Sequence, residues 1–353
     1  MMKSIMMRDS RVVLEDAPIP EPGSGQVLVK SLACGICGSD LHLVRHSREI
    51  FDFYREIGVV PADTNAQDLE INLGHEFCAE IVSFGPDTNQ QLAIGSRVTA
   101  VPMLLGEQGQ LGVGVTPGVP GAYSEYFLLE EALLLPVPDA LPNEAAALVE
   151  PLAVGLHAVN HAQPEADEVA LVAGCGPIGL ACIAALKHLG VKTIVASDPL
   201  ATGRNNAAAF GATHVADPGA QDEMALATEL AGDRRLVVLE CVGLPRMIPD
   251  FIQRTPEQAC IVFTGLHTEP VPFNPAHATV KQLNLKFSYY YEPEEYAACL
   301  QVLTGGNIPW QRMITGTVGI NHVPDAFATL MQRNEHVKVI IEPFSNHQLR
   351  AYR

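Results

Sequence analysis

The sequence predicts an α/β protein of two domains, in which an antiparallel, barrel-like β domain precedes a doubly wound parallel sheet. Two observations carry this prediction. The hydrophobic pattern changes near residue 150, and a glycine motif, Gly174 to Gly179, joins an apolar strand to a helix. The length agrees, because 353 residues with 48% apolar side chains exceed the size of about 250–300 residues at which a single core stops growing.

The first 150 residues have the pattern of an antiparallel β domain. Short apolar runs are interrupted by Gly, Pro and Asp, which favours strands joined by turns. The expected strands are Gln26–Ser31, Cys78–Phe84, Arg97–Val101 and Ala122–Leu129.

Residues 151–290 alternate between strands and helices. The apolar run Glu168–Ala173 meets the glycine motif, a helical segment follows at Leu180–Leu189, and Val191–Ser197 is again a strand. Further buried strands are expected at Leu236–Leu239, Cys260–Thr264 and Leu283–Phe287. Repeated βα units of this kind predict a parallel, doubly wound sheet.

The glycine motif predicts a dinucleotide site. Its glycines allow a tight turn, the approach of a pyrophosphate to a helix N-terminus, and close packing of helix on strand. Asp198, at the end of the next strand, can accept from both ribose hydroxyls and would repel a 2′-phosphate, which favours NAD over NADP. Arg204 is counter-evidence, since it could cover the adenine or approach a phosphate. The candidate cofactor-binding residues are Gly174, Gly176, Pro177, Ile178, Gly179, Asp198 and Arg204.

Three other strings contain the residues that a catalytic zinc needs. They are GICGSDLH at Gly35–His42, GHE at Gly74–Glu76 and EPLAVGLHA at Glu150–Ala158. The thiolate of Cys37, the imidazole of His75 and the carboxylate of Glu150 suit a borderline-soft divalent cation, and three ligands leave one position open. A structural zinc would instead need four closed ligands, and no such quartet can be assembled here. Taken singly, each residue also has an ordinary structural interpretation.

With the glycine motif, these strings resemble the zinc-dependent medium-chain alcohol and polyol dehydrogenases over essentially the whole chain. The resemblance is closest to the sorbitol, butanediol and threonine dehydrogenase branch, where the third string reads EPL. It implies a GroES-like β-barrel catalytic domain of residues 1–150 and 291–353, and a Rossmann domain of residues 151–290 that binds NAD. It also implies one catalytic zinc per subunit, bound by Cys37 and His75, with Glu76 or Glu150 as a further ligand.

The resemblance also assigns roles to the residues after Cys37. Asp40 would orient a ligand or buffer the charge of the metal. Ser39 would take the proton of the substrate hydroxyl, and His42 would release it to solvent, since a histidine pKa near ~6.5 suits an outlet. A surface imidazole without a role remains the alternative for His42.

The function expected from this resemblance is hydride transfer between a secondary alcohol or polyol and NAD. Two alternatives stay open: a metal-free quinone or enone reductase of the same fold, and an NAD-binding regulatory protein without turnover.

Two segments depart from the family pattern. Pro102–Tyr123 has none of the four clustered cysteines that most relatives with a structural zinc carry, so this lobe should be free of metal. The segment between His42 and Gly74, residues 43–73, is longer than in many relatives and contains Arg48–Ile57, which is rich in Ile, Phe and Tyr. It could be a lid over the substrate or a satellite helix packed on the barrel.

Composition limits the partners and the location. A formal net charge of −18 argues against nucleic acid or an anionic membrane as a partner. The sequence contains neither a signal-like N-terminal run nor an apolar stretch of ~18 residues, so we expect a cytoplasmic protein. Of eight cysteines, all but Cys37 are expected to be inert buried thiols, although Cys34 forms a CxxC with it. The β-forming stretch Leu283–Tyr291 predicts an edge strand that a homodimer or homotetramer would cover.

Overall fold

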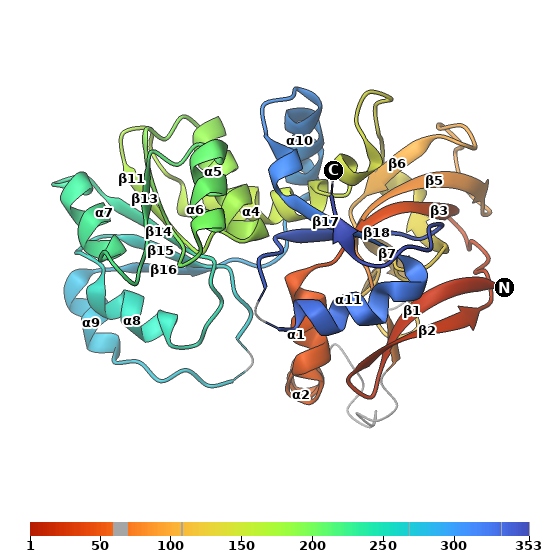
Figure 1. Cartoon of the computed structure of the whole chain (residues 1–353), viewed down its shortest axis with the longest axis horizontal. Coiled ribbons are helices and arrows are strands. Elements are labelled where there is room, and N and C mark those ends of the chain that lie inside the picture. Colours follow the sequence, from red (N-terminus) through yellow and green to blue (C-terminus); the bar gives the residue numbers. More distant parts are fainter. Residues whose placement is uncertain (59–69, 107–108, 268, 333, 353) are drawn as a thin grey trace. The chain divides into compact units, whose positions relative to one another are not determined.

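A computed structural model describes the chain except for residues 59–69, 107–108, 268, 333 and 353. The chain forms two compact units, which Figure 1 shows. The first contains residues 1–150, 300–305 and 314–353, and the second contains residues 151–299 and 306–313. The division after Glu150 coincides with the change of hydrophobic pattern.

The return of the chain to the first unit differs from the expected position at residue 291. Residues 291–299 and 306–313, which the expected division gave to the first domain, belong to the second unit. Residues 291–299 contact helix residues of the second unit: Glu295 binds His157 at 2.7 Å and Asn160 at 2.6 Å.

The first unit is mainly antiparallel. Its large sheet has the order β10-β6-β5-β3-β18-β17-β19, with β9 also paired to β3, and a smaller sheet has the order β2-β1-β4. The strands are β1 (Met2–Arg8), β2 (Arg11–Ala17), β3 (Gln26–Gly35), β4 (Glu70–Asn72), β5 (Glu76–Phe84), β6 (Arg97–Ala100), β7 (Met103–Gly106), β8 (Gly109–Gly112), β9 (Tyr126–Glu130), β10 (Leu134–Pro136), β17 (Ile314–Gly319), β18 (Lys338–Glu342) and β19 (Arg350–Ala351). The helices are α1 (Gly38–Arg45), α2 (Ser47–Glu56), α3 (Asn143–Ala146) and α11 (Val323–Leu330).

Strand β18 brings the C-terminal segment beside the N-terminal one. It pairs antiparallel with the end of β3, where Ile340 faces Gly35 and Ile341 faces Cys34. Since β3 ends at Gly35, two residues before Cys37, this pairing sets Lys338 and its strand beside the first zinc string. Alternating residues of these strands fill one continuous core with side chains such as Val29, Phe77 and Phe127.

The second unit contains a parallel six-stranded sheet of the order β13-β12-β11-β14-β15-β16. Its strands are β11 (Val169–Ala173), β12 (Thr193–Ser197), β13 (His214–Ala216), β14 (Leu236–Glu240), β15 (Cys260–Phe263) and β16 (Asn284–Phe287). Its helices are α4 (Val149–Ala162), α5 (Pro177–His188), α6 (Ala201–Phe210), α7 (Glu223–Ala231), α8 (Met247–Arg254), α9 (Pro275–Lys281) and α10 (Pro293–Thr304), of which α4 begins, and α10 ends, with residues of the first unit. Figure 1 shows α5 and α6 on one face of the sheet and α8 and α9 on the other, as expected for a doubly wound fold.

Helix α2 is packed on the core of the first unit. Ile50 and Phe51 are 3% and 0% exposed and belong to the barrel core, and Tyr54 packs against it. These three side chains therefore fit a satellite helix packed on the barrel. The half-buried Phe53 is the other aromatic residue of the helix and could contact a ligand. The rest of the proposed lid, residues 59–69, lies outside the described residues.

We expect Phe51→Leu to lower the free energy of unfolding by about 1–2 kcal/mol, because it leaves a cavity in a closed core. Phe53→Ala should lower the free energy of unfolding by less, and it serves as the control for effects on substrate choice. Urea unfolding and a ranking of substrates would be measured for both. A changed ranking in Phe51→Leu at unchanged stability would contradict this assignment.

The lobe without cysteines is held by backbone contacts. The hairpin of β7 and β8 is followed by a chain that crosses the GHE string closely: a Cβ at Gly114 would lie 2.1 Å from the Gly74 carbonyl oxygen, and one at Gly121 would lie 2.2 Å from that of Leu73. The amide of Ala122 donates to the Gly74 carbonyl at 2.9 Å. Glycine at these positions thus permits an approach that larger residues would prevent.

Candidate metal and cofactor sites

Helix α1 begins next to the sulfur of Cys37. This residue is the N-cap, and its Sγ accepts hydrogen bonds from the amide of Ser39 at 3.4 Å and from Ser39 Oγ at 3.1 Å. The Asp40 carboxylate accepts in return from the Cys37 amide at 3.2 Å. The sulfur is thereby fixed at the positive end of a helix dipole, which favours a thiolate. Burial acts against this and raises the pKa of the thiol, so a nearby cation is needed to hold the thiolate.

His75 lies beside two residues of α1, although its buried Nδ1 has no hydrogen-bond partner among the described residues. Its Nε2 lies 3.5 Å from Ser39 Oγ, and its Nδ1 lies 3.7 Å from Asp40 Oδ1. Burial opposes protonation of the ring, but the charges of Asp40 and Cys37 outweigh it and raise the pKa of His75 well above its usual value. A carboxylate on one side of an imidazole, with a thiol on the other, is the usual environment of a metal-binding histidine.

Asp40 is held by a tyrosine that the sequence motifs did not indicate. Asp40 is 1% exposed, and the hydroxyl of Tyr123 donates to its Oδ2 at 2.5 Å while lying 3.0 Å from the carbonyl oxygen of Gly35. Burial raises the pKa of this carboxyl. Asp40 is thus a buried residue whose Oδ1 lies 3.7 Å from Nδ1 of His75.

Glu76 and Lys338 form a buried ion pair. Lys338 Nζ lies 2.6 Å from Glu76 Oε1 and donates to the Ile36 carbonyl at 3.0 Å, and both side chains are almost completely inaccessible. Glu76 Oε2 has no hydrogen-bond partner in the described part of the chain. A Cβ at Gly35 would lie 2.1 Å from this oxygen, so glycine is required there. The buried oxygen is therefore available to a cation.

These contacts bring three candidate ligands together. Potential ligand atoms of Cys37, His75 and Glu76 lie within 4.8 Å of one another, and among the described residues they form the only such group of three. Glu150 is buried in the first turn of α4, and its charge contributes to the raised pKa of His75, but it lies outside the group. Thiol, imidazole and carboxylate with one unsatisfied oxygen are a donor set that fits zinc.

The other candidate residues in and beside the first string differ in burial and contacts. Cys34 is fully buried in β3 and, like Cys37, is a free thiol. Ser39 is exposed although it contacts Cys37 and His75. His42 is half-buried one turn further along α1, and its ring lies 4.7 Å from that of His46. Ser39 and His42 are three residues apart and so lie on the same side of the helix.

The glycine motif forms the expected tight turn in the second unit. Gly174 has a φ of +90°, and a Cβ at Gly179 would lie 1.8 Å from the Gly174 carbonyl oxygen. Pro177 stands in the first turn of α5, where its missing amide costs nothing, and Ile178 is half-buried beside it. Gly176 is open, since a Cβ there would meet no atom within 4 Å. The start of α5 can therefore face a phosphate.

Asp198 lies beside this turn, at the end of β12. Its Oδ2 accepts from the amide of Cys175 at 2.8 Å and its Oδ1 from that of Leu200 at 2.8 Å. Arg204 donates from Nη1 to the carbonyls of Asp198 at 2.7 Å and Pro199 at 3.0 Å. The two residues proposed for opposite cofactor preferences are therefore neighbours.

Two family models match the chain. Residues 23–139 match the alcohol dehydrogenase GroES-like domain, and residues 177–305 match the zinc-binding dehydrogenase model. The (R,R)-butanediol dehydrogenase of Bacillus subtilis is 30% identical over 350 residues, covering 95% of this chain and 97% of the relative. This chain belongs to the zinc-dependent medium-chain dehydrogenases. The family expected from the sequence is confirmed.

Other relatives of this dehydrogenase agree in length and fold. The sorbitol dehydrogenase of Bacillus subtilis is 27% identical, with 97% of each chain covered. The crystal structure of the 2R,3R-butanediol dehydrogenase from Bacillus subtilis superposes with a TM-score of 0.81 at 28% identity, over 97% of this chain and all of the other. The crystal structure of a protein from Sinorhizobium meliloti, described as a zinc-binding dehydrogenase and bound to NADP, has a TM-score of 0.80 at 26% identity. The match covers 97% of this chain and 99% of the other. The GroES-like and Rossmann folds expected from the sequence are confirmed.

Proposed function

We propose that this dehydrogenase transfers a hydride between a secondary alcohol or polyol and NAD, so that the alcohol and NAD⁺ give the ketone, NADH and a proton. The observation that carries the proposal is the group of Cys37, His75 and Glu76, whose ligand atoms lie within 4.8 Å of one another. Butanediol and sorbitol dehydrogenases among the relatives support the substrate class.

Cys37, His75 and Glu76 are the proposed zinc ligands. Glu76 is preferred over Glu150 because a carboxylate oxygen of Glu76 belongs to this group, and because its buried Oε2 has no hydrogen-bond partner among the described residues. Three protein ligands leave a position for substrate. When bound, zinc supplies a Lewis acid that lowers the pKa of an alcohol hydroxyl, and bound NAD⁺ supplies the hydride acceptor.

The protein's own residues then handle the proton. Ser39 Oγ is exposed and lies 3.1 Å from the Cys37 sulfur and 3.5 Å from His75 Nε2, so a hydroxyl proton can leave through it. His42, on the same side of α1, offers the next acceptor toward solvent. Asp40, held by Tyr123, keeps the His75 ring in place and is a positioning residue.

The cofactor is proposed to lie along the carboxyl ends of the parallel strands. Gly174, Gly176, Pro177, Ile178 and Gly179 would receive the pyrophosphate at the start of α5. Asp198 would accept from the ribose hydroxyls with the oxygen lone pairs that its two amide contacts leave unused.

A panel of secondary alcohols, diols, polyols and 3-hydroxy amino acids, read by the absorbance of the reduced cofactor, tests this function. We expect activity with NAD⁺ that a chelator removes and added Zn²⁺ restores. Turnover of enones or quinones by the metal-free protein would instead support the quinone or enone reductase alternative, and cofactor binding without turnover of any substrate would support the regulatory one.

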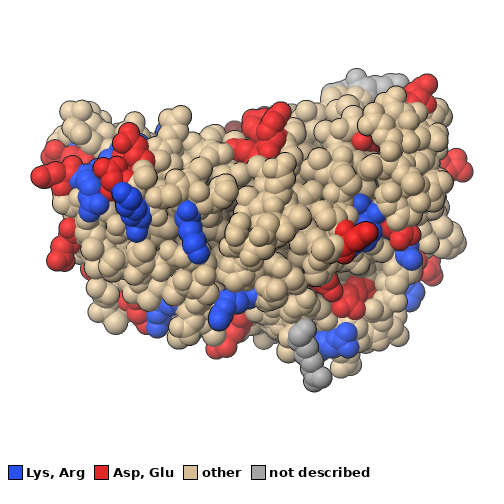
Figure 2. Space-filling model, turned by 90° about the horizontal axis from the view of Figure 1, so that it is seen from above, with Lys and Arg blue, Asp and Glu red and all other residues tan. Residues whose placement is uncertain are grey.

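The cysteine content and the surface charge support the proposal of a cytoplasmic protein without a nucleic-acid partner. All eight cysteines are free thiols, which suits the reducing cytoplasm. Within the described residues, no helix is both long and apolar enough to cross a membrane. On the face shown in Figure 2, basic side chains do not merge into one basic patch, and several stand beside acidic ones. Nothing on that face favours a nucleic acid as partner.

We also propose a homo-oligomer, a dimer or a tetramer, that covers β16. This strand is the edge of the parallel sheet, and the neighbouring Val280, Phe287 and Tyr289 are 76%, 64% and 74% exposed. An uncovered edge with apolar side chains favours association.

We expect Phe287→Glu/Tyr289→Glu to shift the molar mass in light scattering toward the 37.9 kDa of one chain. Val215→Glu, a change of an exposed residue at the opposite edge strand, is the control. An unchanged oligomer in the double variant would contradict the assignment of this edge.

A further inference from the structure

Two aspartates end adjacent strands of the parallel sheet. Ser197 of β12 is the register partner of Ala216 of β13, and Asp198 and Asp217 follow these two residues directly. The amide of Asp198 donates to the Ala216 carbonyl at 3.2 Å, which holds the two strand ends together. Both carboxylates therefore lie at the carboxyl edge, where the proposed cofactor would place its adenosine ribose.

Arg204 lies between these two strand ends. Its Nη1 is 3.1 Å from Asp217 Oδ2, in addition to its contacts with the carbonyls of Asp198 and Pro199. Three acceptors thus surround one terminal nitrogen of the guanidinium. Asp217, at the end of β13, is the charged one of these acceptors.

The Asp198 carboxylate is fixed independently of Arg204. Its two oxygens accept from backbone amides, and a Cβ at Gly203 would lie only 2.7–3.0 Å from its carboxyl atoms. Asp198 therefore keeps its position when Arg204 or Asp217 changes, which makes the two acidic residues separable by mutation.

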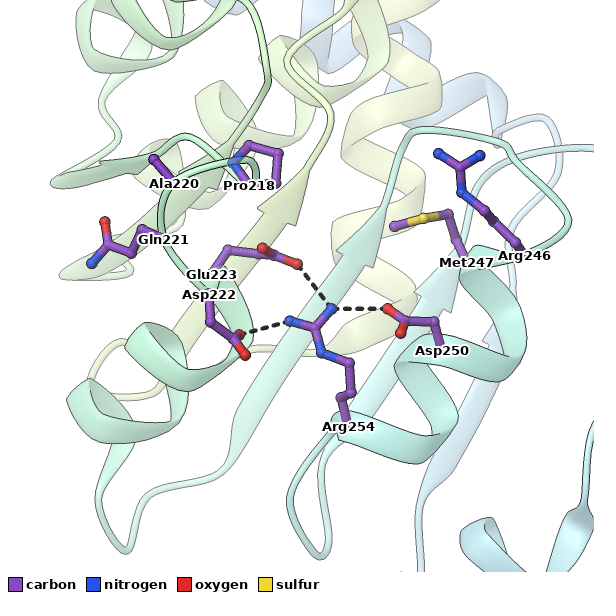
Figure 3. Close-up of a pocket in the computed structure, with 9 residues that line it drawn as sticks. All are labelled: Pro218, Ala220, Gln221, Asp222, Glu223, Arg246, Met247, Asp250 and Arg254. Atoms are coloured by element: carbon purple, nitrogen blue, oxygen red, sulfur yellow. Dashed lines mark hydrogen bonds and ion pairs between the residues drawn. The ribbon is translucent and has the colours of Figure 1, made fainter.

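A pocket of about 590 Å³ is lined by Pro218, which follows Asp217, and by two more arginines, Arg246 and Arg254. Figure 3 shows Arg254 directed at three carboxylates, Asp222 at 2.6 Å, Asp250 at 2.8 Å and Glu223 at 3.2 Å, so its charge is already compensated. Arg246 lies across the pocket at the start of α8 and has no ion pair in the described part of the chain. It is the competing candidate for binding an additional phosphate.

We propose that Asp217 is a specificity-determining residue that makes this dehydrogenase prefer NAD to NADP by retaining Arg204. The inference rests on the proposed NAD-linked function. Asp198, Arg204 and Asp217 together carry a net charge of −1 beside the ribose, which opposes the dianionic 2′-phosphate. Neutralising Asp217 brings this charge to 0 and removes the charged acceptor of Arg204, leaving the guanidinium held by two backbone carbonyls alone. Neutralising Asp198 as well brings the charge to +1. The effect of the two aspartates on cofactor choice should therefore be graded.

The test is a fluorescence titration with NADH and with NADPH, without substrate, on the full chain. Asp217→Asn is the first variant, because asparagine keeps the oxygen that accepts from the Gly219 amide at 3.0 Å. A unit charge about 8 Å from a dianion in a watery site changes binding by on the order of fivefold, so the ratio of the NADPH to the NADH dissociation constant should fall by about that factor. The double variant Asp198→Asn/Asp217→Asn should lower this ratio further.

Two controls separate the possible causes. Asp233→Asn removes the same charge from an exposed position before β14, at the amino end of a central strand, and should leave the ratio unchanged. Arg204→Gln in the Asp217→Asn background should abolish the gain in NADPH affinity, whereas Arg246→Gln in that background should not.

Three results would overturn the inference: a ratio in Asp217→Asn equal to that of the wild type, a gain that survives Arg204→Gln, or a gain that Arg246→Gln abolishes. A wild type that binds neither cofactor would instead refute the proposed function itself, which keeps the two failures distinguishable.

Discussion

Replacing Cys37 by serine is expected to give a protein that binds NADH normally but contains no zinc and does not oxidise alcohols. Serine keeps an oxygen at the N-cap of α1, and hydroxyl groups are good caps, so the helix should persist. The thiolate is lost, however, and with it the softest donor of the proposed zinc site. A metal contribution of several kcal/mol to the transition state corresponds to a fall in kcat/KM on the order of 10³-fold or more.

Elemental analysis, NADH titration and steady-state rates would measure the three parts of this result. Cys34→Ser is a control, because the buried Cys34 belongs to the same CxxC but lies outside the group of three ligands. We expect it to retain one zinc per subunit. Full zinc content in Cys37→Ser, or two zinc ions in the wild type, would contradict the proposed site.

The parts of this site that the sequence predicts are the ones encoded in short strings. Cys37, Ser39 and Asp40 belong to one helical turn with its cap, and His75 and Glu76 are adjacent at the start of β5, so local spacing fixes their relation. The glycine motif is equally local, since the turn, the helix start and Asp198 all belong to one βαβ unit.

The parts that the sequence does not predict depend on contacts between distant segments. Tyr123 is 83 residues from Asp40, and Lys338 is 262 residues from Glu76. A lysine at the start of the apolar string KVIIEPF was the available signal for Lys338, but its partner is set by the pairing of β18 with β3. The sequence left open whether helix α2 is a lid or packs on the barrel for a related reason. Helical spacing of apolar residues predicts a buried face but does not say which surface covers it.

The ion pair between Lys338 and Glu76 gives the largest expected effect on stability. Lys338→Met keeps most of the side-chain volume but leaves the Glu76 carboxylate and the Ile36 carbonyl buried without their donor. Removing one partner of a buried pair typically costs about 3–5 kcal/mol, since an uncompensated charge remains in a medium of low dielectric constant. We expect the metal-free first unit to unfold at correspondingly lower denaturant concentration.

Zinc should reduce this cost in a way that identifies its cause. If Glu76 is a ligand, the cation compensates the carboxylate that Lys338 no longer contacts, so added Zn²⁺ should stabilise Lys338→Met more than it stabilises the wild type. Circular dichroism would follow both units, whereas Trp310, the single tryptophan, lies in residues 306–313 and reports on the second. Its fluorescence is therefore the internal control.

The double variant Glu76→Gln/Lys338→Met distinguishes a charge effect from a packing effect. It removes both charges, so the metal-free protein should regain much of the lost stability, although it should bind zinc weakly because the carboxylate is gone. If the double variant is as unstable as Lys338→Met alone, the loss comes from packing of the lysine side chain against its strand. If it regains stability and still binds zinc as tightly as the wild type, Glu76 is not a ligand, and Glu150 is the carboxylate to replace next.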